Sequence, residues 1–564
     1  MNKKINFGSL FICLFISGIQ SQNLIPFDWE LALGQHTDTE KTIPVNLFFS
    51  WERQGISAAT PPGILQNTFT VPKSKATSTF TLEVTLLCKV KRIRINGHYI
   101  GGNFSTEFIW SPAPSYPSRK FSIPNAYLNF GAQNTIAIKC SAYSYTGGHS
   151  HNSVILYDES PATSDIQIAF EPGDHRFEDS RDVRFQLITD SGSKAAVRLM
   201  IQNDYRDTIV SREVDVQKGK QSRTISLDSA RLHPGFYSVS AVLDDGGYTG
   251  TTRFFTLSPT AIKPSPPSPS SHTEFWNTAL RELQTVPPKF TLEKKEHLSN
   301  SKRDGYIVGM QSLGGKTIYG YYFRPKREGR YAAILNVPGY GYGFEHLEEF
   351  LEVDDDVIEL ALCVRGHGLS KDALPVAFPV PGVFGYEICT PDKTAYRQIY
   401  MDCIRAIEFL LAREEVDVSR IGVTGSSQGG GLALMTAGLA SDHIRAVAYG
   451  DPFPTDLTNH IKIRIIIKGE LKEFLQYYDQ ACRFEDALQT LDLLDTRHFA
   501  SQIRAETLYV TGLADDDCPP RLGFTAYNQI HAPKQFRIFP DDSHIAESGW
   551  KKEIMQFFKK VLKF

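Results

Sequence analysis

The sequence lacks an excess of charge of either sign. Its 564 residues include 60 Lys and Arg and 63 Asp and Glu, so the formal net charge is −3. Nucleic acid and acidic membrane surfaces attract strongly basic proteins, and this composition gives no electrostatic reason to expect either as a partner. Hydrophobic residues at 41% and charged residues at 22% are typical of globular proteins. At about 150 residues per domain, the length predicts three or four folded units.

Cysteine is scarce, and its spacing excludes two common kinds of site. The 8 cysteines include no CxxC pair, so neither a zinc ribbon nor a dithiol redox motif is present. We predict that most of them are small buried thiols. Cys88 and Cys140 both lie in strand-like runs, and this pair is the candidate for a disulfide.

Long apolar runs are missing beyond the N-terminus. There, Lys3 and Lys4 precede an apolar run over residues 7–19, and small and polar residues follow up to Gln22. This order is typical of a secretory signal peptide, predicted over residues 1–22. A membrane anchor is disfavoured because the run is shorter than the roughly 20 residues that span a bilayer. We therefore expect no membrane span, and export to the periplasm or the cell exterior.

Short alternating runs predict an all-β sandwich over residues 23–160. Residues 79–87 and 90–95 alternate apolar and polar side chains, and residues 135–140 form a similar run. Asn96-Gly97 directly after the second run is a strong hairpin signal, because a type I′ turn needs positive φ at both central positions.

The order of motifs in this region resembles the jelly-roll, galactose-binding-like domain that precedes the catalytic core of many glycoside hydrolases. The matching segments are residues 95–101, 123–128 and 131–138. The resemblance implies either a sugar-binding module or a structural spacer. His98, Trp110 and Tyr116 are candidates for an aromatic sugar platform, although core or turn positions are more common for such residues.

Two histidines of the same region, His149 and His151, lie close together. No further Cys, His or carboxylate is spaced to complete a metal site with them. We predict a polar loop at this point.

A second β-rich stretch, residues 161–258, is predicted to be an Ig-like sandwich. It shows no cluster of catalytic residue types, so we interpret it as a spacer. A Pro/Ser-rich linker over residues 259–272 follows. In residues 273–564, strand-like runs alternate with helical ones, which predicts an α/β domain with a mostly parallel sheet.

A GxSxG motif lies in this last region. Residues 419–425 form a β-branched strand-like run, Gly425-Ser426-Ser427-Gln428-Gly429 overlaps its end, and a small-residue helical run continues from there. In the α/β-hydrolase fold this strand–turn–helix pushes the central serine hydroxyl out of the sheet. The motif therefore predicts Ser427 as a nucleophile.

A serine nucleophile needs a base and an acid. Asp515 follows a strand-like run at residues 506–511, and His544 follows the last such run, at residues 535–539. The order Ser, Asp, His is that of α/β-hydrolases. The acid orients the imidazole, and the imidazole removes the serine proton. The competing candidates by position are Asp516, Asp517, Asp541, Asp542 and His531.

The oxyanion hole is predicted from backbone N–H groups. One candidate is the N–H of Gln428, directly after the nucleophile. The other is the N–H of Tyr340, in the Gly-rich loop that follows the strand-like run at residues 332–337.

These motifs together resemble the acetyl xylan esterase / cephalosporin C deacetylase family, carbohydrate esterase family seven. The matching segments are residues 339–341, 364–368, 425–434, 512–520 and 524–528. The resemblance implies an α/β-hydrolase fold with Ser427, Asp515 and His544 as the triad. It also implies that Tyr340 and Gln428 donate the oxyanion hydrogen bonds, and that no cofactor or metal takes part.

Two positions depart from the family pattern. The family's Arg-Gly-Gln is Arg365-Gly366-His367 here, and the Glu after the catalytic histidine is Ile545. The resemblance implies that Arg365 ties loops near the site. His367 either keeps the hydrogen bonding of the family's Gln or alters the preference for acyl group or sugar. Because Ile545 also removes a support next to His544, we expect a divergent member of the family.

Residues 455–496 are predicted to form a cap over the site. The part up to Tyr478 has a helical pattern. Its aromatic residues Phe474, Tyr477 and Tyr478 either shape the acyl pocket or pack in the core.

These observations predict an exported serine carbohydrate esterase. It would remove small O-acyl groups, foremost acetyl, from plant polysaccharides or oligosaccharides such as xylan through an acyl-enzyme on Ser427. One alternative is a prolyl-peptidase-type hydrolase, although the N-terminal region lacks the repeats of a β-propeller. The other is a glycan-binding protein with an inactive hydrolase domain. The sequence leaves the acyl group, the sugar and the oligomeric state open.

Overall fold

The structure is a computed structural model of the 564-residue chain. It describes residues 22–33, 42–47, 56, 63–86, 88–105, 118–143, 153–158, 164–227, 232–245, 247–264, 268–341, 343–344, 346–353, 355–376, 382–463, 471–472, 474–475, 481–515, 517–544 and 549–564. The predicted signal peptide, apart from its last residue, lies outside the described residues. So do several residues singled out above: Trp110, Tyr116, His149, His151, Tyr477, Tyr478, Asp516 and Ile545.

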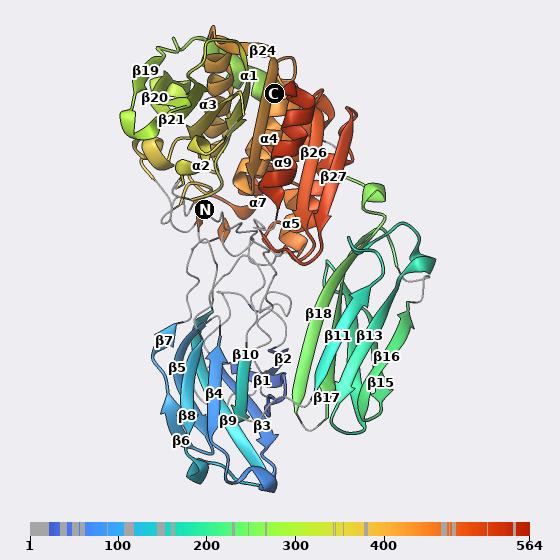
Figure 1. Ribbon diagram of the computed structural model, residues 1–564. Helices are drawn as coiled ribbons and strands as arrows, with labels where there is room; N and C mark the ends of the chain where they lie inside the picture. Colours follow the sequence, from blue (N-terminus) through green and yellow to red (C-terminus); the bar gives the residue numbers. More distant parts are fainter. Residues whose placement is uncertain are drawn as a thin grey trace, which may run out of the picture.

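The N-terminal region consists of two sheets that share one hydrophobic core (Figure 1). One sheet has the order β2-β1-β3-β9-β5-β6, with β7 paired to β5, and the other has the order β10-β4-β8. The strands are β1 (Asp28–Leu33), β2 (Thr42–Asn46), β3 (Gly63–Thr70), β4 (Phe80–Thr85), β5 (Cys88–Ile95), β6 (His98–Gly101), β7 (Phe104–Ser105), β8 (Arg119–Ile123), β9 (Gln133–Tyr143) and β10 (Ser153–Asp158). The predicted β region is thus present, and its assignment as a jelly roll stays a prediction.

The hairpin predicted at Asn96-Gly97 is confirmed. These two residues join β5 to β6, and both have positive φ, 47° and 83°. A type I′ turn requires this conformation, and Asn and Gly reach it at the lowest cost. At the start of β6, the ring of His98 stacks on that of Tyr127, with centroids 4.2 Å apart.

The sequence left open whether Cys88 and Cys140 form a disulfide, and in the structure both are buried free thiols. The register of β5 and β9 places Cys140 opposite Val90 and Cys88 opposite Tyr143, so the two cysteines are not direct cross-strand partners. Burial raises the pKa of the Cys88 thiol, and its hydrogen bond with Cys140 adds to this effect. Within the described part of the chain, a disulfide joins Cys389 to Cys482 in the C-terminal region.

The middle region is also built from two sheets around one core, ordered β11-β13-β16 and β12-β18-β17-β14-β15 (Figure 1). The strands alternate buried and exposed side chains, as expected for sheets that pack on one face. They are β11 (Asp165–Phe170), β12 (Arg176–Phe177), β13 (Arg184–Ser191), β14 (Ala195–Asn203), β15 (Thr208–Val216), β16 (Gly219–Ser226), β17 (Gly235–Asp244) and β18 (Tyr248–Leu257).

The C-terminal region contains a 9-stranded sheet ordered β19-β20-β21-β23-β22-β24-β25-β26-β27. The pairs from β23 to β27 are parallel, and β19 to β21 form an antiparallel extension. The strands are β19 (Thr291–Lys294), β20 (Arg303–Gln311), β21 (Thr317–Pro325), β22 (Tyr331–Asn336), β23 (Val357–Cys363), β24 (Val416–Ser426), β25 (Ala446–Gly450), β26 (Glu506–Gly512) and β27 (Lys534–Phe539). The mostly parallel sheet predicted for this region is therefore present.

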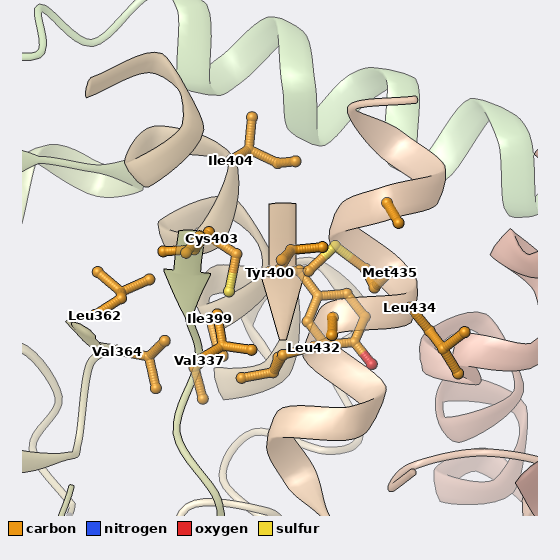
Figure 2. Packing of buried hydrophobic residues seen from close by; sticks show 14 of the residues in the cluster. Val337, Leu362, Val364, Ile399, Tyr400, Cys403, Ile404, Leu432, Leu434 and Met435 are labelled. Atoms are coloured by element: carbon orange, nitrogen blue, oxygen red, sulfur yellow. The ribbon is translucent and has the colours of Figure 1, made fainter. Parts of the chain in front are cut away.

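Helices cover both faces of this sheet. They are α1 (His272–Gln284), α2 (Glu348–Leu351), α3 (Ala395–Leu411), α4 (Gln428–Leu439), α5 (Leu457–Ile463), α7 (Phe484–Leu494), α8 (Pro520–Tyr527) and α9 (Trp550–Phe558). One face packs against α1, α3 and α4, and Figure 2 shows side chains from α3 and α4 meeting Val337 and Leu362. The alternate residues of the same strands, such as Ile334 and Leu508, pack against α9.

Residues at the start of the predicted linker pack against the C-terminal region. Ile262 is buried in the same core as α1 and α3, and Asn528 donates hydrogen bonds to the carbonyls of Pro259 and Ile262. Across the described residues, no helix combines the length and the apolar character needed to cross a bilayer.

Candidate active site

The predicted nucleophile stands at a sharp turn between β24 and α4. Ser427 has φ 59° and ψ −126°, a conformation that costs energy for a residue with a Cβ. Its backbone N–H donates to the carbonyl of Gly450, and its carbonyl accepts from Gly431. A Cβ on Gly425 would lie 2.6 Å from the backbone of Gly429, so the strand and the helix meet too closely for a side chain there. The strand–turn–helix expected from the GxSxG motif is therefore present.

The structure brings Ser427, His544 and Asp515 together at the carboxyl end of the parallel strands. The Nε2 atom of His544 lies 3.0 Å from the Oγ atom of Ser427, and its Nδ1 atom lies 2.8 Å from Oδ2 of Asp515. The carboxylate only accepts, so Nδ1 carries the proton and Nε2 is left to accept the serine proton. The spacing is within the hydrogen-bond reach that general-base catalysis needs.

Asp515 is held in its ionised form. Its side chain is buried, and its Oδ1 atom accepts hydrogen bonds from the backbone N–H groups of Asp517 at 2.7 Å and Cys518 at 2.9 Å. Burial alone raises the pKa of this carboxyl. The charge of His544 and the hydrogen bond to it act in the opposite direction, so the pKa of Asp515 is lowered overall.

The competing carboxylates and His531 do not contact Nδ1 of His544, as far as the structure describes them. Asp517 has a carboxylate oxygen 3.5 Å from Nε2 of His544, on the serine side of the ring. Asp541 pairs with Arg253, and the backbone of Asp542 bonds to Phe539 and Ala514. His531 is exposed. Only Asp515, among the described candidates, contacts Nδ1 of His544.

A second buried carboxylate beside the acid was missed from the sequence. Asp451 follows β25 and has φ 33°. One of its oxygens lies within 4.8 Å of the nearest ligand atoms of both Asp515 and His544, and Oδ1 accepts from the hydroxyl of Thr511 at 2.8 Å. In the sequence Asp451 only follows an apolar run, and the structure adds that the carboxyl end of this strand lies between those of β24 and β26.

Gln428, the residue directly after Ser427, is held by hydrogen bonds of its side chain. Gln428 is the first residue of α4, so its N–H has no acceptor within the helix. Its side chain accepts from the hydroxyl of Tyr396 at 2.6 Å and donates to the carbonyl of Gly339 at 3.3 Å. This ties the loop that carries Tyr340 to the start of α4. The Tyr340 hydroxyl in turn accepts from the N–H of Val383 at 2.7 Å.

His367 takes part in the same arrangement. Its Nε2 atom lies 3.3 Å from the amide nitrogen of Gln428, and its Nδ1 atom lies 3.2 Å from the carbonyl of Arg365. An amide nitrogen only donates, so Nε2 accepts and Nδ1 donates, which requires a neutral ring. Burial lowers the pKa of His367, and its hydrogen bond to Arg365 opposes that effect only in part. The residue at this departure from the family pattern is therefore hydrogen-bonded to Gln428.

Arg365 ties together segments below the site. Its guanidinium binds Asp402 at 2.9 and 2.5 Å, Gln398 at 2.7 Å and the carbonyl of Leu313 at 3.3 Å. Both Arg365 and Asp402 are fully buried. The two residues therefore connect the loop after β23 to α3.

The described part of the predicted cap borders this region. Phe474 packs against Phe384 and against Gly385, where a Cβ would lie 2.3 Å from the Phe474 side chain. The disulfide between Cys389 and Cys482 links the same two segments. Helix α7, which the sequence pattern did not predict, completes the segment.

A family model described as acetyl xylan esterase (AXE1) matches residues 259–561. Acetyl esterase Axe7A of Xylanibacter ruminicola is 26% identical over 354 residues, which are 61% of this chain and 78% of that protein. The acetyl xylan esterase from Paenibacillus sp. R4 is 30% identical, with 54% of this chain and 98% of that chain covered and a TM-score of 0.49. Acetyl xylan esterase 1 from Thermoanaerobacterium sp. JW/SL YS485 is 27% identical, with 54% and 97% covered and a TM-score of 0.49.

Proposed function

The chain belongs to the acetyl xylan esterase family and is a carboxylic ester hydrolase, and from this premise we propose that it removes O-acetyl groups from plant polysaccharides or oligosaccharides such as xylan. The observation that carries the proposal is the contact of His544 with both Ser427 and Asp515 within the region that matches the family. The relatives named acetyl esterase and acetyl xylan esterase support acetyl as the acyl group.

In the proposed reaction, His544 takes the proton from Ser427 as the serine oxygen attacks the acetyl carbonyl carbon. The tetrahedral oxyanion is held by the backbone N–H groups of Gln428 and Tyr340. The intermediate then collapses, His544 returns the proton to the sugar oxygen, and an acetyl-enzyme on Ser427 remains. Water, activated by the same imidazole, releases acetate. Asp515 orients the ring and stabilises its charged form throughout.

The surrounding hydrogen bonds support this assignment of the oxyanion donors. The Gln428 side chain is bonded to Tyr396, His367 and the Gly339 carbonyl, so both N–H candidates belong to segments that are tied to each other. Such pre-organisation matters because donors that need no rearrangement stabilise the developing charge most. We also propose that the chain is exported, on the basis of the signal sequence over residues 1–22.

The test compares the wild type with Ser427→Ala and with a matched control, Ser426→Ala, which removes the neighbouring hydroxyl of the same turn. The assays are hydrolysis of p-nitrophenyl acetate and release of acetate from acetylated xylo-oligosaccharides. We expect Ser427→Ala to lose about 10⁶-fold in kcat, as for other serine nucleophiles, and the control to keep most of its rate. Equal rates for wild type and Ser427→Ala would contradict the proposal.

A substrate panel separates this function from its alternatives. We expect acetyl esters to be cleaved faster than butyryl and longer esters, and acetylated xylan to release acetate. Cleavage of proline-containing peptides with no acetate release would favour the peptidase. Binding of glycans without turnover of any ester would favour a binding protein.

A further inference from the structure

The loop that carries the catalytic acid is held between two short helices. Asp515 stands after β26, and the loop runs from there into α8, which begins at Pro520. On its other side lies α5, whose buried residue His460 donates from Nε2 to the carbonyl of Asp517 at 2.9 Å. The N–H of Asp517 in turn donates to the Asp515 carboxylate. Asp517 therefore links α5 to Asp515, so a shift of the helix would also move the carboxylate.

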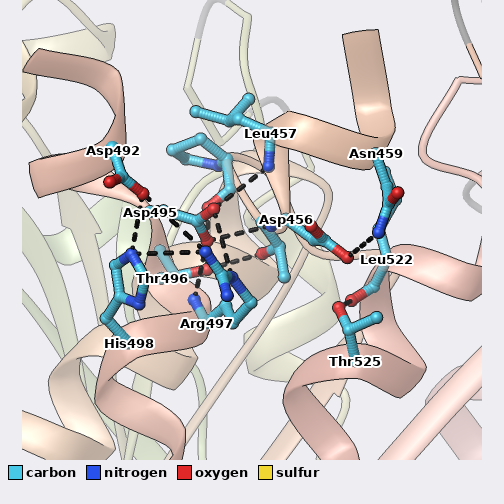
Figure 3. Close-up of polar contacts among 12 residues, drawn as sticks. Asp456, Leu457, Asn459, Asp492, Asp495, Thr496, Arg497, His498, Leu522 and Thr525 are labelled. Atoms are coloured by element: carbon cyan, nitrogen blue, oxygen red, sulfur yellow. Dashed lines mark hydrogen bonds and ion pairs between the residues drawn. The ribbon is translucent and has the colours of Figure 1, made fainter. Parts of the chain in front are cut away.

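Figure 3 shows the polar contacts at the start of α5. The carboxylate of Asp495, only 1% exposed, accepts from the backbone N–H groups of Asp456 at 2.9 Å and Leu457 at 3.0 Å. This caps the first turn of the helix. The Asp456 carboxylate accepts from the Asn459 amide at 2.7 Å, and Arg497 lies 3.5 Å from Asp495.

The middle β region also contacts α5. Residues 204–206, part of the loop between β14 and β15, form the segment that reaches it. The Tyr205 hydroxyl donates to Oδ1 of Asn459 at 3.0 Å, and the Arg206 guanidinium donates to the carbonyl of Lys462 at 2.8 Å. Asn459 directly precedes His460, so the contact falls on the turn of α5 that holds the acid loop.

The same loop also binds α8. Asp204 binds Arg521 through two hydrogen bonds, at 2.5 and 3.1 Å, and the two side chains are only 10% and 12% exposed. The Arg521 guanidinium lies over the ring of Tyr205, 4.8 Å from its centroid. Phe236 of β17 adds a ring contact with Phe524 of α8 at 5.7 Å. Helices on both sides of the acid loop are thus held by one loop of the middle region.

The loop of residues 204–206 is itself rigidly built. Asn203 accepts from the N–H of Asp207 and donates to its carboxylate, both at 2.9 Å, and the N–H of Asp204 donates to the Phe236 carbonyl at 3.0 Å. Because these hydrogen bonds fix the conformation of the loop, its contacts can hold α5 and α8 in defined positions.

We propose that the loop of residues 204–206 is a positioning element of the esterase site, which keeps Asp515 aligned with His544 by bracing α5 and α8. This inference rests on the proposed function, because it assumes that Asp515 orients the catalytic histidine. A triad without a properly working acid loses about 10⁴-fold in rate, so a partial misplacement of Asp515 leaves room for a large and measurable loss. The middle β region then takes part in catalysis, rather than serving as the spacer expected from the sequence.

The experiment uses the full chain with Asp204→Asn, which removes the charge that faces Arg521, and Tyr205→Phe, which removes only the hydroxyl that bonds to Asn459. The matched control is Asp28→Asn, which breaks the ion pair of Asp28 with Arg198 between the N-terminal and middle regions. For each variant, kcat and KM are measured with p-nitrophenyl acetate, and the concentration of active sites is titrated with an organophosphonate.

We expect kcat per titrated site to fall about tenfold in Asp204→Asn and about threefold in Tyr205→Phe, with KM within about twofold of the wild type, because the acid acts on the chemical step. The acid limb of the pH profile of kcat/KM should move to lower pH, since a displaced carboxylate stabilises the protonated imidazole less. The control should keep the kcat and the pH profile of the wild type.

A purely structural contact would give a different result. It would lower the number of titratable sites or the thermal midpoint and leave kcat per site and the pH profile unchanged, and that outcome overturns the inference. If Asp204→Asn does not fold, the result for Tyr205→Phe decides alone. Failure of the proposed function is distinguishable, because the wild type itself would then show no dependence on Ser427.

Discussion

The ion pair of Arg365 with Asp402 leads to a prediction about stability. In the substitution Arg365→Met, the apolar part of the side chain is retained and the guanidinium is lost. Asp402 then keeps the backbone N–H of residue 365 as a partner at 3.1 Å but loses its bonds to the guanidinium. Both side chains have 0% exposure, so water does not replace the lost partner.

The magnitude follows from this burial. Removal of one partner of a buried ion pair costs about 3–5 kcal/mol, because it leaves an uncompensated charge in the interior. In a domain of this size, 1 kcal/mol corresponds to about 2–4 °C in Tm, so we expect the midpoint to fall by roughly 6–20 °C. The double substitution Arg365→Met with Asp402→Leu removes both charges, and it should recover most of this loss.

The assay is the temperature at which esterase activity is lost, followed together with circular dichroism. Arg181→Gln is the contrast, because Arg181 and its partner Asp179 are 80% and 38% exposed and an exposed pair contributes about 0–1 kcal/mol. The reasoning is refuted if Arg365→Met shifts the midpoint by no more than this contrast does. It is equally refuted if the double variant is as unstable as the single one.

Three further predictions concern other contacts. Tyr396→Phe removes the hydroxyl that bonds to Gln428. We expect kcat to fall about three- to tenfold with KM little changed, which is less than the 10²–10³-fold loss from removal of an oxyanion donor. An unchanged kcat would contradict this role. Burial lowers the pKa of His272 from 6.5 to about 4, so the unfolded chain binds more protons than the folded one between these pH values. Stability should therefore decrease as the pH falls through this window, by about 3 kcal/mol at its end, and His272→Phe should flatten the pH dependence of the thermal midpoint. Cys389→Ser breaks the bond to Cys482 across 93 residues and should lower stability by up to about 4–5 kcal/mol, and a reductant should destabilise the wild type but not the variant.

Much of the candidate site could be predicted from the sequence because each element carries a local signal. A β-branched run, Gly425, Ser427 and a small-residue helix are contiguous, so the turn was predictable from one segment. Asp515 and His544 each follow a strand directly, and the carboxyl ends of parallel strands meet at one edge of the sheet. Asp515 and His544 could be predicted although they are far from Ser427 in the sequence, because the fold places the triad residues after particular strands in a fixed order.

Other features carry no local signal. Cys88 and Cys140 were the candidate disulfide pair, but both are buried free thiols, and a disulfide forms instead between two loop segments 93 residues apart. Asp451 was missed because one aspartate after one strand means little until β25 is placed beside β26.

The sequence by itself determined the nature of the C-terminal fold, the nucleophile turn and the order of the candidate triad, because hydrophobic periodicity and short turns are properties of contiguous residues. Only the tertiary structure decided that His367 is neutral and bonded to Gln428, and that Tyr205 reaches Asn459 from another sheet region. Those contacts join residues more than 60 positions apart, and their distances depend on how whole sheets and helices pack. Packing energy is the sum of many weak contacts between distant parts of the chain, so it cannot be read from any short segment.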